Sequence, residues 1–317
     1  MRPDFCVMIL THGRPANVKT YAALLRHGYT GKVYLVVDDE DKTADAYRAR
    51  YGNQVLTFSK KAIAERFDEA DNFTDRRAVF YARNASFELA EAVGCRYFIQ
   101  LDDDYGAFLY RRQKNATGIG QSLAPKGRKI KNLDGIFTAM VEFLRVSQQV
   151  SAVAMSQGGD LDHIRGFIGA ADEALLKRKA MNSFVCDTHK PFPFLGRLNE
   201  DVSTYVSLGR RGLLFFTSFK VQLTQAKTQQ TEGGMTELYL AAGTYVKSFY
   251  TVMREPSCVK IAGMGYQAGH YRLHHVINWN AAVPKIIRSP MQKQHDKQET
   301  YAGAYDSACN DRSNGFV

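Results

Sequence analysis

The sequence predicts an α/β protein with a mostly parallel central sheet that is flanked by helices. Short apolar runs of strand length alternate with segments of helical periodicity through the first half of the chain. The runs are continuously apolar, as in strands that are buried on both faces of a parallel sheet. Polar residues follow several of the runs directly, and ligands of such sheets bind beyond the carboxyl ends of the strands.

The first three strands and two helices are expected within the first 58 residues. The strands are predicted at 5–10, 33–37 and 54–58, with helices at 17–27 and 43–51 between them. The first strand is followed by Thr11-His-Gly-Arg-Pro15 and the second by Asp38-Asp-Glu-Asp41. Because parallel strands have their carboxyl ends at one edge of a sheet, both polar segments are expected at that edge.

A helix at 78–93 and a strand at 96–101 extend this sheet. Apolar residues recur at helical spacing through the helix, and Gly94 is a suitable C-terminal cap. The strand ends in three consecutive aspartates, Asp102 to Asp104. An exposed basic loop is expected at 111–131, followed by a helix at 133–148 and a strand at 150–156.

The composition is that of an ordinary soluble protein. The chain has 317 residues, 45% hydrophobic and 23% charged, which excludes a disordered or fibrous class. The length predicts one large domain with an elaborated second half. No apolar run approaches the roughly 18 residues of a membrane span. The five cysteines lie far apart without a CxxC pair, which predicts reduced thiols in a cytoplasmic protein.

The chain is basic, with 42 Lys and Arg against 32 Asp and Glu and a net charge of +10. Such a balance favours a polyanionic partner through counterion release, although an ordinary basic surface explains it as well. The cations of the predicted loop are Arg111, Arg112, Lys114, Lys126, Arg128, Lys129 and Lys131.

Three adjacent aspartates at the end of a buried strand need a neutralising partner. Like charges this close raise each other's pKa, and a divalent cation with oxygen ligands relieves the repulsion. Mg²⁺ or Mn²⁺ held by one or two carboxylates completes its shell with water and phosphate oxygens, which suits a diphosphate leaving group. The alternative is that Asp102 to Asp104 only cap the following turn.

The segments Ala82-Arg-Asn-Ala-Ser-Phe87 and Tyr97-Phe-Ile-Gln-Leu-Asp-Asp-Asp104, with Gly94 between them, resemble the strand and DxD signature of GT-A glycosyltransferases. The resemblance implies the GT-A nucleotide-diphospho-sugar transferase fold, Mn²⁺ or Mg²⁺ as cofactor and a UDP-sugar as donor. It makes Asp104 the direct metal ligand, places Asp102 nearer the ribose or a metal-bound water, and leaves Asp103 as the ambiguous middle residue.

The same resemblance implies a set of nucleotide-binding residues. In the family, the loop after the first strand and the acidic end of the second hold the nucleobase and ribose, while the helix before the DxD strand faces the nucleotide. The corresponding residues here are Thr11, His12, Arg14, Asp38, Asp39, Arg83 and Asn84.

A second acidic motif of GT-A enzymes, Glu-Asp at a helix start, is matched by Asn199-Glu-Asp-Val202. Asp201 is then the candidate general base for an acceptor hydroxyl, with Glu200 beside it. The alternative is a capping carboxylate at the helix N-terminus. Many GT-A enzymes also use a late histidine as metal ligand, and the candidates are His270, His274 and His275, with His274 favoured.

A closer resemblance is to the TET-associated glycosyltransferases of phages. It rests on Leu10-Thr-His-Gly-Arg-Pro15, Leu101-Asp-Asp-Asp-Tyr105, His274-His-Val-Ile-Asn-Trp-Asn280 and Val283-Pro-Lys-Ile286. It implies sugar transfer to a hydroxymethylated pyrimidine, 5-hydroxymethylcytosine, in DNA within the host cytoplasm. A base in duplex DNA must be extruded for this, and Tyr105, Phe192 and Phe194 are candidates to stack on it.

The resemblance suggests three segments, with a nucleotide-sugar-binding half at 1–157, an acceptor-binding half at 158–294 and a polar tail at 295–317. Three other functions remain open: a GT-A enzyme with a non-DNA acceptor, a nucleotidyltransferase, and a DNA-binding phage protein without activity. Nucleotidyltransferases carry a Gly-rich basic loop after the first strand, which Thr11 to Pro15 match poorly. The donor sugar and the oligomeric state are open.

Overall fold

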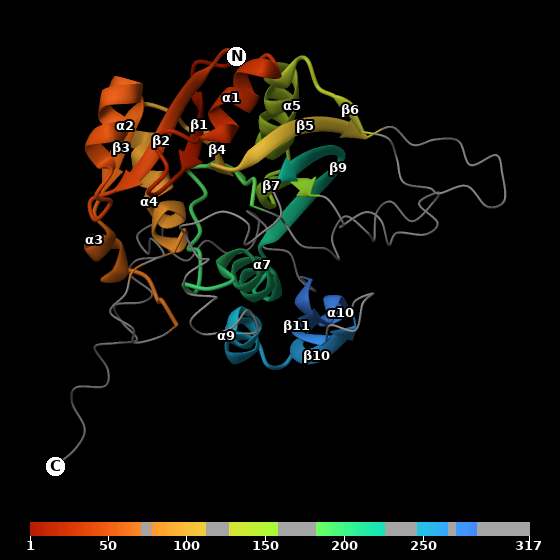
Figure 1. The fold of residues 1–317 in the computed structure, drawn as a ribbon. Helices are drawn as coiled ribbons and strands as arrows, with labels where there is room; N and C mark the ends of the chain where they lie inside the picture. The colour runs from red at the N-terminus through yellow and green to blue at the C-terminus, as the bar shows by residue number, and fades with distance from the viewer. Residues whose placement is uncertain are drawn as a thin grey trace, which may run out of the picture.

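The computed structural model describes residues 1–70, 76, 78–111, 127–157, 182–225, 246–265 and 271–283. These residues form a nine-stranded sheet with helices on both faces and, beside it, a two-stranded sheet (Figure 1). The strand order in the large sheet is β3-β2-β1-β4-β8-β7-β9-β5-β6. The predicted α/β fold with a mostly parallel, helix-flanked central sheet is confirmed.

The first four strands of the large sheet are all parallel. They are β1 (Phe5–Leu10), β2 (Lys32–Asp38), β3 (Val55–Phe58) and β4 (Tyr97–Asp102), with β1 paired to both β2 and β4. The helices that connect them are α1 (Lys19–Arg26), α2 (Ala44–Tyr51), α3 (Lys60–Ala64) and α4 (Phe80–Ala92), with a 3-10 turn at Gly52–Gln54. These elements agree with the expected ones to within a few residues, except the 3-10 turn and the short α3, which were not expected.

The other half of the sheet mixes strand directions. Its strands are β5 (Tyr105–Arg111), β6 (Gly127–Lys129), β7 (Val150–Gln157), β8 (Val185–Asp187) and β9 (Leu214–Gln225). β8 runs antiparallel between β4 and β7, β7 and β9 are parallel, and β5 is antiparallel to both β9 and β6. Strands from beyond residue 157 therefore complete the same sheet as the N-terminal strands.

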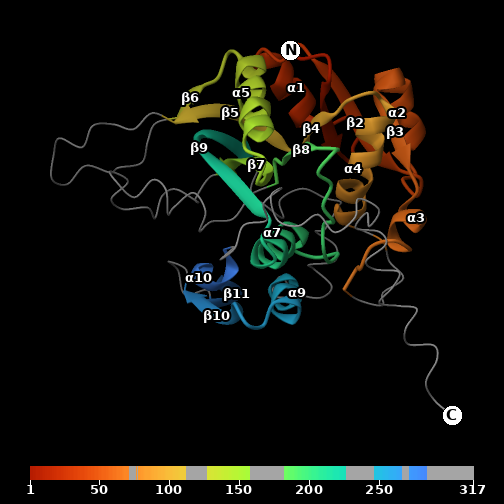
Figure 2. The same cartoon turned by 180° about the vertical axis from the view of Figure 1, so that it is seen from behind.

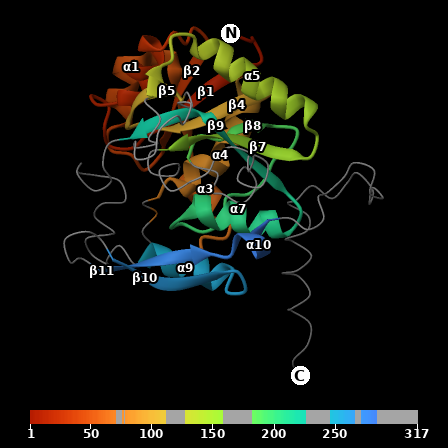
Figure 3. The ribbon, with the colours of Figure 1, turned by 90° about the vertical axis from the view of Figure 1, so that its right-hand side faces the viewer.

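Helices cover the two faces of the sheet. Figure 3 shows α1 and α5 (Leu133–Val146) on one face and α4 and α7 (Glu200–Arg210) on the other. Below α7 lie α9 (Val246–Arg254), the antiparallel pair β10 (Val259–Gly265) and β11 (Tyr271–Ile277), and α10 (Trp279–Ala282), as Figure 2 also shows from behind. No helix in the part of the chain that the structure describes is long and apolar enough to cross a bilayer.

Strand β1 shows why the apolar runs are continuous. Cys6, Met8 and Leu10 belong to the core under α4, whereas the alternate side chains of Phe5, Val7 and Ile9 belong to the core under α1 and α5. All six are buried because each face of the strand is covered by helices. The cysteines that the structure describes are free and buried: Cys6, Cys95, Cys186 and Cys258.

One expectation for the basic segment is wrong. Residues 127–129, which were expected in a loop, form the exposed edge strand β6, and β5 just before this segment was not expected at all. β5 and β6 pair only with each other and with β9, so their pairing is set by distant residues and not by local periodicity. Residues 112–126, His270 and the tail at 295–317 lie outside the described residues.

Gly28 is required by the turn that leaves α1, and we expect Gly28→Ala to destabilise the fold. Its φ is +76°, and an added Cβ would lie 2.3 Å from the Lys131 carbonyl oxygen. Strain and clash together predict a loss of at least about 2 kcal/mol in the free energy of unfolding by urea titration. Gly94→Ala is the matched control, because Gly94 has a similar φ of +69° but nothing lies within 4 Å of the added Cβ. This variant should lose only about 1 kcal/mol in the free energy of unfolding. Equal losses would contradict the steric argument.

Candidate active site at the carboxyl edge of the sheet

The polar segments that follow β1, β2 and β4 meet at one edge of the sheet, as expected for neighbouring parallel strands. Thr20 near the start of α1 fixes the aspartate turn there. Its hydroxyl donates to the Asp102 carbonyl at 2.6 Å and its backbone N–H donates to the Asp103 carbonyl at 3.1 Å. The N–H of Tyr105 donates back to the Thr20 hydroxyl at 2.9 Å. The three aspartates are therefore held against helix α1.

Asp103 binds the loop after β1. The Thr11 hydroxyl donates to one Asp103 oxygen at 2.7 Å, and Arg14 Nη1 donates to the other at 3.2 Å. Tyr47 from α2 supports the same loop, with its hydroxyl 2.7 Å from Thr11 Oγ1 and accepting from the Arg14 N–H at 2.8 Å. Burial raises the pKa of Asp103, partly offset by Thr11 and Arg14. Asp103 thus holds the side chains of Thr11 and Arg14 in place.

The end of β2 carries a second group of charges. His12 Nδ1 lies 2.7 Å from Asp38 Oδ2 and 3.6 Å from Asp41 Oδ2, and Lys60 Nζ lies 3.0 Å from Asp38 Oδ1. Burial acts to raise the pKa of Asp38, but His12 and Lys60 outweigh it and lower the pKa. Next to this group Asp39 is exposed, and its carboxylate accepts from the Lys60 N–H at 3.0 Å.

Within the described ranges, one group of three His, Cys, Asp or Glu side chains has its ligand atoms within 4.8 Å of one another, and it consists of His12, Asp38 and Asp41. These carboxylates already have donors. Asp41 accepts from the Gly13 N–H and from both the N–H and hydroxyl of Thr43, and Lys60 neutralises Asp38. We therefore assign the group to shaping the loop and not to binding metal.

Asp102 is held by protein donors on both carboxylate oxygens. Arg83 Nη2 donates to Oδ1 at 2.9 Å and Asn182 Nδ2 donates to Oδ2 at 3.2 Å. The Tyr105 hydroxyl lies 3.4 Å from Oδ2 and 2.9 Å from the Asn182 carbonyl oxygen. Burial raises the pKa of Asp102, and the nearby guanidinium of Arg83 opposes the rise. The carboxylate has little freedom left to move toward a ligand.

Arg83 connects Asp102 to the start of α7. Its side chain is fully buried, and its Nε donates to Glu200 Oε1 at 2.8 Å. The guanidinium lies within 6 Å of the ring centroids of Phe184 and Phe194, so aromatic faces exclude water from it. Burial raises the pKa of Glu200 against the opposing attraction of Arg83.

Asn84, the next residue of α4, binds the protein's own backbone. Its Nδ2 donates to the carbonyls of Phe80 and Phe194, both at 3.2 Å, and its Oδ1 accepts from the Phe194 N–H at 2.8 Å. The side chain is buried and fixes the segment before α7. Its expected place facing the nucleotide stays a prediction.

Asp104 has the freest carboxylate of the three. Gln225 Nε2 donates to its Oδ2 at 3.2 Å, whereas Oδ1 is buried and has no hydrogen-bond partner among the described residues. Burial, followed by repulsion from Asp102 and Asp103, raises the pKa of Asp104 to about 6. A buried acceptor that lacks a donor and lies near two other carboxylates fits a cation with oxygen ligands.

The predicted catalytic pair stands at the start of α7. Asn199 before it has a left-handed backbone with φ of +57°, and its Nδ2 donates to the Thr251 hydroxyl on α9 at 2.6 Å. One Asp201 oxygen accepts from the N–H of Val202 at 2.8 Å, and Asp201 is half-buried. Glu200 is thus linked to Asp102 through their shared ion-pair partner Arg83, while the side chain of Asp201 remains partly accessible.

Two of the candidate histidines lie on β11. The rings of His274 and His275 are 4.2 Å apart, and the His275 side chain is buried with Nδ1 3.5 Å from Asn199 Nδ2. The structure therefore places His275 beside the residue that precedes Glu200 and Asp201. That a histidine of this strand binds metal stays a prediction.

Several polar residues at this edge were missed. Thr20, Asn182 and Gln225 contact the aspartates, and Gln100 Nε2 donates to the Arg83 carbonyl at 2.9 Å. The sequence did contain an indication for Gln100, because a fully buried strand rarely contains a glutamine without a hydrogen-bond partner. The others lie on elements remote in sequence and gave none.

The suggested base-stacking aromatics are wrong. Tyr105, Phe192 and Phe194 are at most 4% exposed, and both phenylalanines pack in the core against each other and against neighbouring rings. Side chains covered this completely have no face left for an extruded base.

Comparisons with known proteins give a family and distant structural likenesses. The family model described as TET-Associated Glycosyltransferase matches residues 5–234. Glucosyl-3-phosphoglycerate synthase from Mycobacterium tuberculosis, in complex with Mg²⁺ and UDP, is 13% identical with a TM-score of 0.41, covering 91% of this chain and 90% of that one. A mannosyltransferase from Pyrobaculum calidifontis, in complex with GDP-Man and Mn²⁺, is 13% identical with a TM-score of 0.44, covering 81% and 75%. A search of curated sequences gives no match.

Proposed function

The chain belongs to the TET-associated glycosyltransferases, and from that premise we propose that it transfers a sugar from a UDP-sugar to 5-hydroxymethylcytosine in phage DNA, with a divalent cation. The family establishes a glycosyltransferase, whereas the donor, the cation and the acceptor are parts of the proposal. The observation that supports it most is the buried oxygen of Asp104 at the carboxyl edge of the sheet, which has no hydrogen-bond partner among the residues that the structure describes.

Asp104 is the residue proposed to hold Mn²⁺ or Mg²⁺. Asp102 is engaged by Arg83, Asn182 and Tyr105, so it acts beside the cation, through a bound water or the ribose. When bound, the cation neutralises negative charge that develops on the departing diphosphate. His274 and His275 are retained as further candidate ligands from the acceptor side.

The donor nucleotide is proposed to lie over the ends of β1 and β2. His12 is 41% exposed and Asp39 is exposed, so both can reach the nucleobase or ribose. Thr11, Arg14 and Asp38 lie in the same two segments, where hydrogen bonds to Asp103, Tyr47 and Lys60 hold them in place. A preorganised loop loses little conformational entropy when the nucleotide binds.

Asp201 is proposed as the general base. The hydroxymethyl oxygen of the acceptor forms a bond to the anomeric carbon, the bond from that carbon to the diphosphate breaks, and Asp201 takes the hydroxyl proton. Glu200 serves as a positioning residue, because its ion pair with Arg83 fixes the start of α7. Asp201→Asn should keep UDP binding while transfer falls by about 10²–10⁴-fold.

The proposal is tested by product analysis. The protein is incubated with Mn²⁺, a panel of UDP-sugars and DNA that contains either cytosine or 5-hydroxymethylcytosine, and the digested nucleosides are weighed by mass spectrometry. A mass gain of one hexose or N-acetylhexosamine, confined to the hydroxymethylated DNA, is expected. Mn²⁺-dependent hydrolysis of the UDP-sugar without such a gain would retain the transferase and reject DNA as its acceptor.

A further inference from the structure

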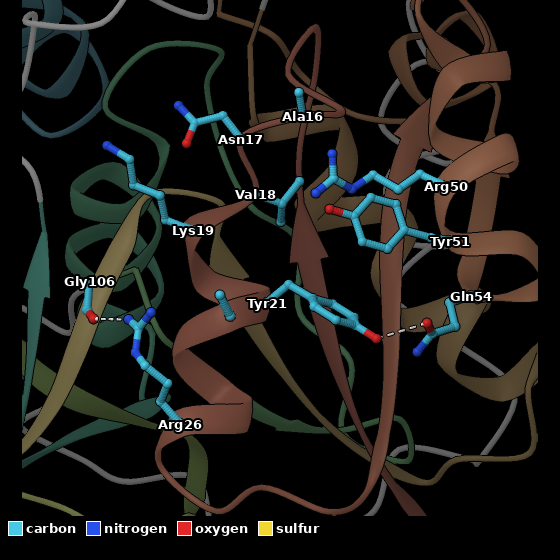
Figure 4. A pocket seen from close by; sticks show the side chains of 11 residues that line it. Ala16, Asn17, Val18, Lys19, Tyr21, Arg26, Arg50, Tyr51, Gln54 and Gly106 are labelled. Atoms are coloured by element: carbon cyan, nitrogen blue, oxygen red, sulfur yellow. Dashed lines mark hydrogen bonds between the residues drawn. The ribbon is translucent and has the colours of Figure 1, made fainter.

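A groove of about 610 Å³ lies on the side of the aspartate turn where α1, α2 and β5 meet (Figure 4). Its lining includes three cations, Lys19, Arg26 and Arg50, and two tyrosines, Tyr21 and Tyr51. None of the described residues that line it is acidic. None of them belongs to the metal, nucleotide or catalytic sites proposed above.

The three cations are exposed and, within the described residues, none forms a salt bridge. Arg26 donates one hydrogen bond to the Gly106 carbonyl at 3.0 Å, and the Arg50 guanidinium lies 5.6 Å from the ring centroid of Tyr51. In contrast, Arg48 on the same helix as Arg50 is paired with Asp45. The groove therefore concentrates uncompensated positive charge, which attracts an anionic ligand.

The tyrosines give the groove an aromatic floor. Their rings lie 5.2 Å apart, and the Tyr21 hydroxyl donates to Gln54 Oε1 at 3.0 Å, as Figure 4 shows. The Tyr51 hydroxyl donates to the Pro15 carbonyl at 3.4 Å. Rings held in this way present a fixed apolar surface beside cations, a combination found where proteins bind the sugars, bases and phosphates of nucleic acids.

One end of the groove adjoins the candidate active site. Lys19 directly precedes Thr20, which binds the carbonyls of Asp102 and Asp103, and Gly106 comes two residues after Asp104. On the other side of β5, the edge strand β6 exposes Arg128 and Lys129. Positive charge thus continues from the aspartate turn along α1 and across β5.

We propose that this groove binds the phosphate backbone of the DNA strand that flanks the target nucleotide, an inference that rests on DNA being the acceptor. Lys19, Arg26 and Arg50 contact phosphates, while Tyr21 and Tyr51 contact a deoxyribose or base. Because these contacts do not read base edges, the groove holds DNA in register without selecting its sequence.

The test compares two triple variants of the full chain with equal loss of charge. The groove variant is Lys19→Gln/Arg26→Gln/Arg50→Gln, and the control is Lys61→Gln/Arg145→Gln/Lys260→Gln on α3, α5 and β10. Binding of a fluorescent duplex containing 5-hydroxymethylcytosine is followed by anisotropy between about 50 and 200 mM salt. UDP binding is measured in parallel, and thermal melting checks the fold of both variants.

We expect the groove variant to bind DNA about 10–100-fold more weakly than the wild type, with a salt dependence that is less steep by about 1 per cation removed. The control should bind within a few-fold of the wild type. Equal losses in the two variants, or loss of UDP binding with unchanged DNA binding, would overturn the assignment. If the wild type glycosylates DNA but the groove variant binds DNA as well as the control does, the groove assignment is wrong and the proposed acceptor stands. If the wild type binds DNA through the groove but does not glycosylate it, the proposed acceptor is wrong and the groove assignment stands.

Discussion

Asp104→Asn should lower sugar transfer by about 10³-fold, because it removes the carboxylate proposed to bind the cation that stabilises the leaving diphosphate. The amide keeps the shape of the side chain and its place near Gln225, so the change is electrostatic. Mn²⁺ binding, followed by the loss of the free-ion electron paramagnetic resonance signal, should weaken in parallel with the rate of product formation.

The same variant should not lose stability. Burial and two neighbouring carboxylates raise the pKa of Asp104 to about 6, so its charged form is disfavoured in the folded chain without a cation. Removing that charge should leave the free energy of unfolding unchanged or slightly higher at neutral pH. Asp45→Asn, at a 98% exposed side chain, is the control for both assays. An Asp104→Asn protein with undiminished transfer would refute the assigned metal ligand.

Arg83→Met should destabilise the protein by about 3–5 kcal/mol at neutral pH, because it leaves the buried Glu200 carboxylate and the partly buried Asp102 carboxylate without their counter-ion. Methionine fills much of the volume between Phe184 and Phe194, so the loss reports on charge more than on packing. Urea unfolding monitored by circular dichroism measures it. The double variant Arg83→Met/Glu200→Gln should recover part of the loss, since one of the two uncompensated charges is gone.

The loss in the free energy of unfolding caused by Arg83→Met, called the deficit below, should increase with pH. Burial already raises the pKa of Asp102 and Glu200 while Arg83 opposes the rise, so the pKa values are higher still without it. A carboxyl group with a higher pKa in the folded chain binds its proton more tightly there. The deficit is therefore smallest near pH 4, the ordinary carboxyl pKa, and grows as the pH rises through the raised values. A deficit independent of pH would indicate lost packing instead.

The N-terminal half of the site was predictable because its signals are local. Thr11 to Arg14, Asp38 to Asp41 and Asp102 to Asp104 each follow an apolar run, and the rule that parallel strands share a carboxyl edge brings them together. The resemblance to a known family added roles that periodicity does not contain. These parts needed no knowledge of distant contacts.

The remainder depends on contacts between segments far apart in sequence. The hydrogen bonds of Asp102 to Asn182 and of Asp104 to Gln225 join residues that are far apart in the sequence. No pattern in the sequence around these residues predicts either contact. Phe192 and Phe194 look like available aromatics in the sequence, but rings of α4 and β9 pack on Phe192, and Phe184 packs on Phe194. The groove was also missed, because it forms only where α1, α2 and β5 converge.

The ion pairs of Arg83 with Asp102 and Glu200 also limit how this sequence can evolve. Replacing Arg83 alone leaves both carboxylates without their counter-ion, at a cost of about 3–5 kcal/mol. That cost is a large share of the roughly 5–15 kcal/mol by which a folded protein is typically more stable than its unfolded chain. A lineage can therefore lose Arg83 on α4 only together with changes at Asp102 on β4 and Glu200 on α7, two segments that are remote from each other in sequence. Substitutions at these positions should therefore be correlated among relatives, even where the surrounding surface has diverged freely.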